Sequence, residues 1–329
     1  MEIGQLKAGE GVLGFFLLRS AELKTSSNNK KYLDLTLVDK TGEVNSKLWE
    51  CSEEDEKRFR AHKLVKVKGV LIEWQQRLQL KIEKIRLAQP EDGVDIDDFI
   101  PTAPEKSEEM YAEVWRYINS LTNEDMKKIV SKIVTAKKDQ LMYYPAAKEH
   151  HHAISGGLLY HIKTMLRAGE KMAEIYEGIN KDLLFAGIIL HDLAKTDEMQ
   201  AGEIGLITDY TAEGQLLGHI IQGIKSIDQA AREEGADPEV SMLLQHMVLC
   251  HHYEPEFGSP KRPMIPEGEL LHYLDMIDAR MYDMKKALGK TAPGEFSDRV
   301  WVLHNRKLYQ HKFGSKKEDL TESDKGEIF

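Results

Sequence analysis

The sequence of 329 residues has few of the features that mark secreted, membrane-spanning or thiolate-metal proteins. It contains only two cysteines, Cys51 and Cys250, and neither belongs to a CxxC pair, so we expect neither a disulfide framework nor a cysteine zinc site. No run of residues approaches the ~20 apolar positions of a membrane helix, and the early run GVLGFFLL is short and has no basic segment before it. These absences predict a cytoplasmic protein of a reducing compartment, with no membrane partner.

Charge is distributed unevenly along the chain. Residues 1–90 hold more lysine and arginine than aspartate and glutamate, whereas the remaining residues are acidic enough to give the whole chain a net charge of -10. A mildly basic module joined to an acidic one favours a polyanion as the partner of the first module.

Residues 1–90 alternate polar and apolar positions with the period of β-strands. A charged, helix-favouring segment, residues 52–62, falls between the third and the fourth of these runs. Five strands with one helix in that position is the order of an OB-fold barrel, which we therefore predict for residues 1–90 as a nucleic-acid-binding domain. The alternation predicts strands over residues 11–23, 32–39, 43–50, 63–74 and 77–87.

The rest of the chain has a different pattern. Residues 91–109 are acidic and contain proline, which predicts a linker, and residues 110–313 are helical in pattern throughout. Thr122 with Asp125 resembles a capping box that opens a helix. Residues 314–329 are polar and unpatterned, so we expect a disordered tail. The predicted fold class is multidomain, a small all-β barrel followed by an all-α domain.

A second helical pattern lies near the end of the helical region. Residues 267–288 carry an apolar stripe with alternating steps of four and three, so we expect one face of this helix to be buried. The stripe consists of Leu270, Leu274, Ile277, Met281, Met284 and Leu288.

The apolar run GIILHDLAK ends on a histidine and an aspartate. Residues 183–190 are apolar on nearly every side of a helix, so the helix is predicted to be buried. An ionised Asp192 at the end of such a helix is costly unless a cation or strong donors meet it. One interpretation is that the helix surfaces here and Asp192 pairs with Lys195. The other is that His191 and Asp192 ligate a metal ion.

Histidines and aspartates recur along the helical region at intervals of roughly thirty residues, about one helix and its connection, so each helix could bring one or two ligands to one site. Imidazoles and carboxylates without thiolates suit Mn²⁺, Fe²⁺, Zn²⁺ or Mg²⁺, and a carboxylate such as Asp192 can bridge two ions that act on a phosphoryl group. The pattern predicts a metal-dependent phosphohydrolase. The recurring residues are His161, His191 with Asp192, His219, His251 with His252, and Asp275 with Asp278.

The segments that contain these residues resemble a known superfamily. GGLLYH, LHDLAK, GH, CHH and YLDMIDAR, in this order, are similar to the motifs of the HD superfamily of metal-dependent phosphohydrolases. With an OB-like module in front, and with LLGH, HH, GSPKRP and LHYLDMIDARM in this order, nearly all of the chain except its tail resembles the YhaM family of 3′-to-5′ exoribonucleases.

The resemblance implies a function and a ligand set. The expected substrate is single-stranded RNA, with single-stranded DNA as a second candidate, and the expected products are nucleoside monophosphates. A two-ion site is implied, with Mn²⁺ favoured over Fe²⁺, Mg²⁺ and Zn²⁺, and so is a homo-oligomer. The implied core set of metal ligands is His161, His191, Asp192 and Asp275, with His219, His251 and His252 completing a two-metal site or contacting substrate. Asp192, Lys195 and His219 are the implied catalytic residues, with Lys195 near the scissile phosphate.

The last ligand stays open between two aspartates. Angular positions on a helix place Asp278 nearer the apolar stripe than Asp275, whereas the family pattern favours Asp275 as the ligand. We assign Asp278, together with His152, to the residues that support the ligands, and the two aspartates could be reversed.

Nucleic acid would also be held outside the metal site. Lys261 and Arg262, in the turn-rich segment 258–263, are candidates for phosphate contacts, and the alternative is an ordinary solvated loop. In the barrel, the candidates for base stacking and backbone contact are Trp74, Tyr32, Trp49 and Arg77, and the alternative for each aromatic residue is core packing.

Two other functions fit the sequence. The first is an HD-type hydrolase of a dNTP or a cyclic nucleotide, in which the barrel serves regulation or assembly. The second is a non-catalytic single-strand-binding protein with an inactive metal site. A decayed site usually loses a ligand, and here every expected position is filled, which argues against the second.

Overall fold

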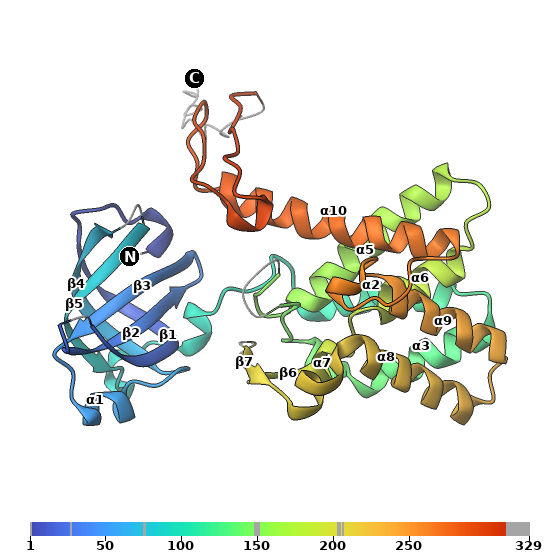
Figure 1. Ribbon diagram of the computed structural model, residues 1–329, viewed down its shortest axis with the longest axis horizontal. Coiled ribbons are helices and arrows are strands. Elements are labelled where there is room, and N and C mark those ends of the chain that lie inside the picture. The colour runs from blue at the N-terminus through green and yellow to red at the C-terminus, as the bar shows by residue number, and fades with distance from the viewer. Residues whose placement is uncertain are drawn as a thin grey trace, which may run out of the picture. The chain divides into compact units, whose positions relative to one another are not determined.

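The computed structural model describes residues 2–26, 28–74, 77–147, 152–202, 205 and 207–313, except for the side chains of Glu53, Arg77, Asp97 and Thr208. The predicted tail, residues 314–329, lies outside the described residues. The chain forms two compact units, Met1–Ala279 and Arg280–Phe329. In chain order, the first unit contains a β-barrel and then a set of helices (Figure 1).

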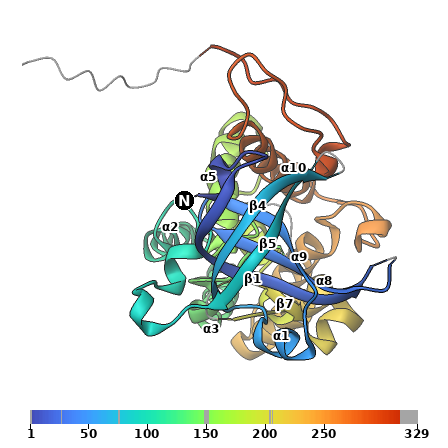
Figure 2. The same cartoon turned by 90° about the vertical axis from the view of Figure 1, so that its left-hand side faces the viewer.

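The five predicted strands form a closed barrel in the order β1-β2-β3-β5-β4. All neighbouring pairs are antiparallel except β3 and β5, which are parallel and close the barrel. Figure 2 shows β1, β4 and β5 side by side. Helix α1 (Glu53–Arg58) follows β3, and Ser52 and Asp55 form its capping box. The predicted barrel is confirmed. The strands are β1 (Gly11–Thr25), β2 (Lys31–Asp39), β3 (Gly42–Trp49), β4 (Leu64–Trp74) and β5 (Arg77–Leu87).

Alternation along the strands sends one set of side chains into the barrel. Phe16, Leu35, Val67 and Leu80 are fully buried there. Asp34, Lys47 and Trp49 are among the residues that point the other way, because a strand places successive side chains on opposite faces. The barrel therefore has its own apolar core.

The segment between barrel and helices contains two short 3₁₀ turns, Pro90–Asp92 and Ile96–Phe99. Ile100 is buried against Leu17 and Val38 of the barrel, and Thr102 pairs with Ser155. The first long helix begins at Ser107, so the predicted linker ends inside this helix.

The remainder of the first unit is mainly helical. No helix in the described part of the chain has the length and apolar character needed to cross a membrane. The helices are α2 (Ser107–Ser120), α3 (Glu124–Ala136), α4 (Lys138–Leu141), α5 (Gly157–Ile175), α6 (Lys181–Leu190), α7 (Lys195–Glu198), α8 (Ala212–Glu234), α9 (Pro238–Cys250) and α10 (Pro266–Leu288).

Two local expectations are wrong. The helical region contains a two-stranded sheet, β6 (Met199–Ala201) and β7 (Ile207–Tyr210), whose strands are too short to show a period of two in the sequence. The cap of α3 is Asn123, whose side chain accepts a hydrogen bond from the backbone N–H of Met126. Thr122 instead donates its hydroxyl and its backbone N–H to Asp182, a contact that depends on the tertiary fold.

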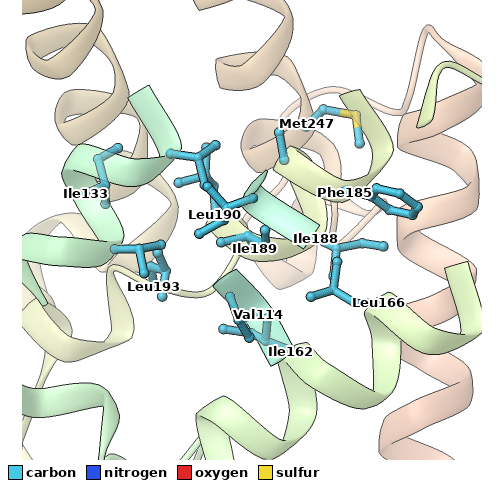
Figure 3. Close-up of a cluster of buried hydrophobic side chains, with 14 of the residues drawn as sticks. Val114, Ile133, Ile162, Leu166, Phe185, Ile188, Ile189, Leu190, Leu193 and Met247 are labelled. Carbon is cyan, nitrogen blue, oxygen red and sulfur yellow. The ribbon is translucent and has the colours of Figure 1, made fainter. Parts of the chain in front are cut away.

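Helix α6 lies in the centre of the helical core, as predicted. Every residue from Leu183 to Leu190 is buried. Figure 3 shows side chains of neighbouring elements, including Ile162 and Met247, around Ile188 and Ile189. A Cβ at Gly187 would lie 2.4 Å from Cε of Met247, so glycine allows α9 to approach closely. The buried helix carries His191 and Asp192 into the interior.

The apolar stripe of α10 is buried only in its first half. Leu270 and Leu274 are buried, whereas Ile277 and Met281 are 50% and 59% exposed. The prediction of a wholly buried face is therefore wrong. The helix continues past Ala279, where the first compact unit ends, and so its last residues belong to the second unit. The second unit adds a 3₁₀ turn, Trp301–Leu303, and antiparallel bridges from Phe296 to Tyr309 and from Val300 to Arg306.

Candidate metal centre

The recurring histidines and aspartates of the helical region meet around Asp192. His161 lies on α5, His219 on α8 and Asp275 on α10. His191 and Asp192 directly follow α6, and His251 and His252 directly follow α9. Two groups of possible metal ligands share Asp192, each with ligand atoms within 4.8 Å of one another: His161, His191 and Asp192, and Asp192, His219, His251 and His252.

The two oxygens of Asp192 face different histidines. Its Oδ2 lies 3.4 Å from Nε2 of His191 and 3.9 Å from Nε2 of His161. Its Oδ1 lies 3.4 Å from Nε2 of His219 and 3.7 Å from Nε2 of His251. We call these two groups the His161 side and the His219 side. Asp275 belongs to the His161 side, because its Oδ1 lies 3.3 Å from Nε2 of His161.

Helix ends fix the orientation of two of these rings. His191 and His251 each occupy the position after the last residue of a helix, where carbonyl groups lack partners within the helix. His191 donates through Nδ1 to the carbonyl of Ile188, and His251 does so to Val248, both at 2.7 Å. A carbonyl only accepts, so Nδ1 carries the proton and Nε2 presents its lone pair to the site.

The other rings are oriented in the same way by different acceptors. Nδ1 of His252 donates to the carbonyl of Phe257 at 2.5 Å. Nδ1 of His161 donates to Asp278 at 2.7 Å, and Nδ1 of His219 donates to Glu198 at 3.1 Å. Each ring therefore turns Nε2 away from its acceptor, which is the arrangement of histidines that ligate metals.

Several atoms of the site are buried without a hydrogen-bond partner. They are Nε2 of His191, His219 and His251 and Oδ1 of Asp192. Burying such a group unpaired costs about 1–3 kcal/mol, so their convergence requires a compensating ligand. Neutral imidazole nitrogens and a carboxylate oxygen are suitable donors for a divalent cation. The donor set fits a metal ion, and the site can bind one.

Lys195 pairs with Asp192 inside the protein. Its Nζ lies 2.7 Å from Oδ2 of Asp192, and Asp192 is only 2% exposed. Burial raises the pKa of the Asp192 carboxyl, but Lys195 and His191 outweigh burial and hold this pKa well below its ordinary value. The ion pair between Asp192 and Lys195, which the simpler interpretation expected, is therefore present. That interpretation also placed the end of the helix at the surface, whereas Asp192 is buried.

His161 and His251, which belong to different sides, differ in how they hold protons. Burial lowers the pKa of His161, but hydrogen bonds with Asp275 and Asp278 outweigh burial and raise it to about 10. Burial, with His252 and His191 nearby, lowers the pKa of His251 well below its ordinary value. Without a metal ion, His161 is protonated at neutral pH and His251 is neutral.

Asp278 and His152 lie behind His161. One oxygen of Asp278 is 2.7 Å from both Nδ1 of His161 and Nε2 of His152. His152 is 1% exposed and has a φ of 52°. A Cβ at Gly157 would lie 2.0 Å from the carbonyl oxygen of His152, so only glycine fits there. Asp275 faces Nε2 of His161, the nitrogen directed into the site, whereas Asp278 faces Nδ1 on the other side of the ring.

The sequence reasoning missed Glu198. Its carboxylate accepts the backbone N–H and the Nδ1–H of His219, both at 3.1 Å. The backbone N–H is available because Gly218, with a φ of 69°, interrupts α8 just before His219. A glycine inside an otherwise helical pattern was the only sequence signal of this break.

The loop after α9 contains the two predicted phosphate contacts. Lys261 is exposed. Arg262 donates to both oxygens of Glu254, at 2.9 and 3.1 Å, and its guanidinium lies 5.3 Å from the ring centre of Tyr253. Arg262 is therefore engaged within the loop itself, which weakens its candidacy as a phosphate contact.

The barrel carries the predicted aromatic residues on its outside. The rings of Tyr32 and Trp49 have centres 4.7 Å apart, and Nζ of Lys47 lies 5.0 Å from the ring centre of Tyr32. Trp49 is 39% exposed and Trp74, at the end of β4, is 59% exposed. Core packing is therefore the wrong interpretation for these two tryptophans. The side chain of Arg77 lies outside the described residues.

Comparison with protein families agrees with this organisation. Residues 18–88 match the family of OB-fold nucleic acid binding domains, and residues 158–280 match the HD domain. The predicted fold class, an OB-fold barrel followed by a helical HD domain, is confirmed. A third match, to a helicase family named TraI_2, covers residues 98–177.

Solved structures show weaker likenesses. The second OB-fold domain of replication protein A from Methanococcus maripaludis is 16% identical, with a TM-score of 0.23, over 27% of this chain and 94% of that one. The SSB domain of a Synechococcus protein is 11% identical, with a TM-score of 0.22, over 25% and 99%. We draw no conclusion from likenesses at these scores. The family matches and the donor set together indicate a nucleic-acid-binding, metal-dependent phosphohydrolase of the HD type.

Proposed function

We propose that this protein is a 3′-to-5′ exoribonuclease that hydrolyses the terminal phosphodiester of single-stranded RNA and releases nucleoside monophosphates. The observation that carries the proposal is the position of Asp192, whose two oxygens face two separate groups of histidines. A carboxylate so placed can bridge two ions about 3.5–4 Å apart, the arrangement that acts on phosphoryl centres. The barrel in the same chain and the resemblance to the YhaM family favour a nucleic acid over a free nucleotide.

In this proposal each ion is held by one side of the site, and Asp192 is shared. Mn²⁺ is the proposed metal, and Fe²⁺, Zn²⁺ and Mg²⁺ accept the same donor types. The first ion would be held by His161, His191, Asp192 and Asp275, and the second would be held by Asp192, His219, His251 and His252.

The bound ions would activate a water molecule as nucleophile and neutralise charge on the phosphate. The side chains of the protein supply the rest. Lys195 keeps Asp192 ionised and places a cation beside the site, where it can also offset the charge that develops on the phosphate. Asp278 and Glu198 hold His161 and His219 in the orientation that directs Nε2 inward. Glu198 thereby fixes the ring of His219, which is the third proposed catalytic residue after Asp192 and Lys195.

The barrel would hold the strand upstream of its 3′ end. Tyr32, Trp49 and Trp74 offer ring faces for bases, and Lys47 offers a charge for the backbone, a combination that binds single strands without reading their sequence. Arg77 and Lys261 are proposed as further backbone contacts.

A gel time course tests the proposal. Full-length protein with added Mn²⁺ is incubated with 5′-labelled single-stranded RNA, with the same RNA closed into a circle, and with DNA of the same sequence. We expect a ladder that shortens from the 3′ end of the linear RNA, no cleavage of the circle, and loss of the ladder when EDTA is added. Comparison with DNA measures the contribution of the 2′-OH.

Other outcomes would assign the site differently. Cleavage of the circle would show an endonuclease. RNA that is bound but never cut would favour the non-catalytic binding protein. RNA that is neither bound nor cut, with hydrolysis of a dNTP or a cyclic nucleotide, would show the small-nucleotide hydrolase.

A further inference from the structure

An exposed aromatic ring lies on the loop that follows a proposed ligand. Phe257 is 70% exposed and ends the 3₁₀ turn Pro255–Phe257, in the loop after His252. A phenylalanine ring left in water forgoes the free energy that its burial would contribute.

The loop that carries Phe257 is tied directly to a proposed ligand. His252 donates its Nδ1–H to the carbonyl of Phe257 and its backbone N–H to the hydroxyl of Ser259, which is fully buried. A Cβ at Gly258 would lie 3.4 Å from Cδ1 of Ile220, so the loop also packs against α8. The backbone of Phe257 is therefore fixed by the metal centre, while its ring remains exposed to solvent.

A nucleotide has the chemistry that this combination would recognise. Its phosphate is an anion for the metal centre, and its base, one sugar away, is a flat apolar surface. We propose that Phe257 is the platform on which the base of the terminal nucleotide stacks while its 5′-phosphate lies at the metal centre. This inference rests on the proposed function and names its specificity-determining residue. Because every base has a ring face, the platform would accept all four bases.

Matched small substrates test the platform without the barrel's contribution. The p-nitrophenyl ester of thymidine 5′-monophosphate carries a base, and methyl p-nitrophenyl phosphate carries none, yet both release p-nitrophenolate. We expect Phe257→Ala to lower kcat/KM for the nucleotide ester about tenfold, mainly through KM, and to leave the methyl ester unchanged. Phe257→Trp should restore kcat/KM for the nucleotide ester. Tyr176→Ala, which removes an exposed aromatic ring after α5, is the control and should change neither.

The outcomes separate the platform from the proposed function. Hydrolysis of both esters, with Phe257→Ala affecting both equally or neither, would overturn the platform and leave the phosphodiesterase standing. If the wild type hydrolyses neither ester, the RNA time course decides the proposed function, and the platform is tested by binding alone. The Mn²⁺-loaded protein should then quench the fluorescence of 2-aminopurine riboside 5′-monophosphate, and Phe257→Ala should abolish quenching. Quenching that is absent or unchanged in the variant would overturn the platform.

Discussion

The barrel exposes its proposed ligand-binding side chains at its outer surface, whereas the helical domain buries its proposed metal ligands. In the barrel, Trp49 and Trp74 are exposed and the core consists mainly of aliphatic side chains, with Phe16 and Phe59. In the helical domain, His161, His191 and Asp192 are buried at the ends and inner faces of helices. Exposed rings suit a long, flexible ligand of changing sequence, whereas buried ligands hold an ion in fixed geometry. The difference predicts that the barrel governs binding of long substrates and the helices govern the chemical step.

The largest expected effect comes from Asp192→Asn. Asparagine has one carbonyl oxygen and cannot serve both sides of the site, and Lys195 loses its ionic partner. We expect kcat/KM for RNA and for the p-nitrophenyl ester of thymidine 5′-monophosphate to fall together, by about a thousandfold or more, because an ion supplies several kcal/mol of transition-state stabilisation. Metal content, measured by mass spectrometry, should fall as well.

Asp197→Asn is the matched control for this variant. Asp197 pairs with Lys137 and is exposed, so its variant should retain activity within a factor of about two, as most surface changes do. Full activity of Asp192→Asn would refute the bridging position of Asp192.

The converse variant, Tyr32→Ala with Trp49→Ala, should act on long substrates alone. Loss of two stacking rings should weaken binding of labelled RNA about 10- to 100-fold and leave hydrolysis of the small ester unchanged. Fluorescence anisotropy in EDTA at one stated salt concentration measures this binding. Trp301→Ala, which removes an exposed tryptophan outside the barrel, is the control. An equal loss of RNA binding and of hydrolysis of the small ester would contradict the proposal that the barrel governs binding and the helices govern the chemical step.

Within the metal centre, Glu198→Gln should selectively weaken the binding of one ion. The oxygen of glutamine can accept only part of what the carboxylate accepts from His219, so Nε2 of His219 loses its fixed direction. We expect the affinity of one ion to fall about 10- to 100-fold while the other ion stays bound, as for other groups that orient metal ligands. Calorimetric titration with Mn²⁺ measures both affinities.

Two further variants give this result its meaning. Glu198→Asp should recover part of the affinity. Glu213→Gln, a change on helix α8 where Glu213 pairs with Lys225 at the surface, should bind as the wild type does. A loss of thermal stability without a change in metal binding would indicate that Glu198 is only structural.

A change of pH, with no substitution, should also distinguish the two sides. The pKa of His161 is raised to about 10, so metal-free protein holds a proton there at neutral pH, and an ion must displace it. Affinity on the His161 side should therefore rise with pH, by up to about tenfold per unit between roughly pH 6 and 8, with release of a proton. The pKa of His251 is lowered, so its ring is already neutral and contributes no such dependence.

Proton release on Mn²⁺ binding can be measured by titration in buffers of different ionisation enthalpy. Asp278→Asn removes one carboxylate that raises the pKa of His161, so less proton should be released. Equal pH dependence of both ions would contradict the difference between the sides.

Much of the fold could be predicted because it follows from local periods. Alternation with a period of two gave the barrel strands, and the unbroken apolar run 183–190 gave the buried helix α6. Short elements failed, since β6 and β7 have too few residues to show a period. The stripe of α10 failed differently, because a stripe reports that a face is apolar but not how far its neighbours extend.

The sequence by itself determined which residue types could form the site, and their recurrence at the spacing of helices. Only the tertiary structure decided that Asp192 faces two sides, that Asp275 rather than Asp278 faces Nε2 of His161, and that Glu198 holds His219. These are relations across space between residues far apart in the chain. They depend on helix ends, on the break at Gly218 and on which ring nitrogen meets an acceptor, and the order of amino acids does not encode such distances locally.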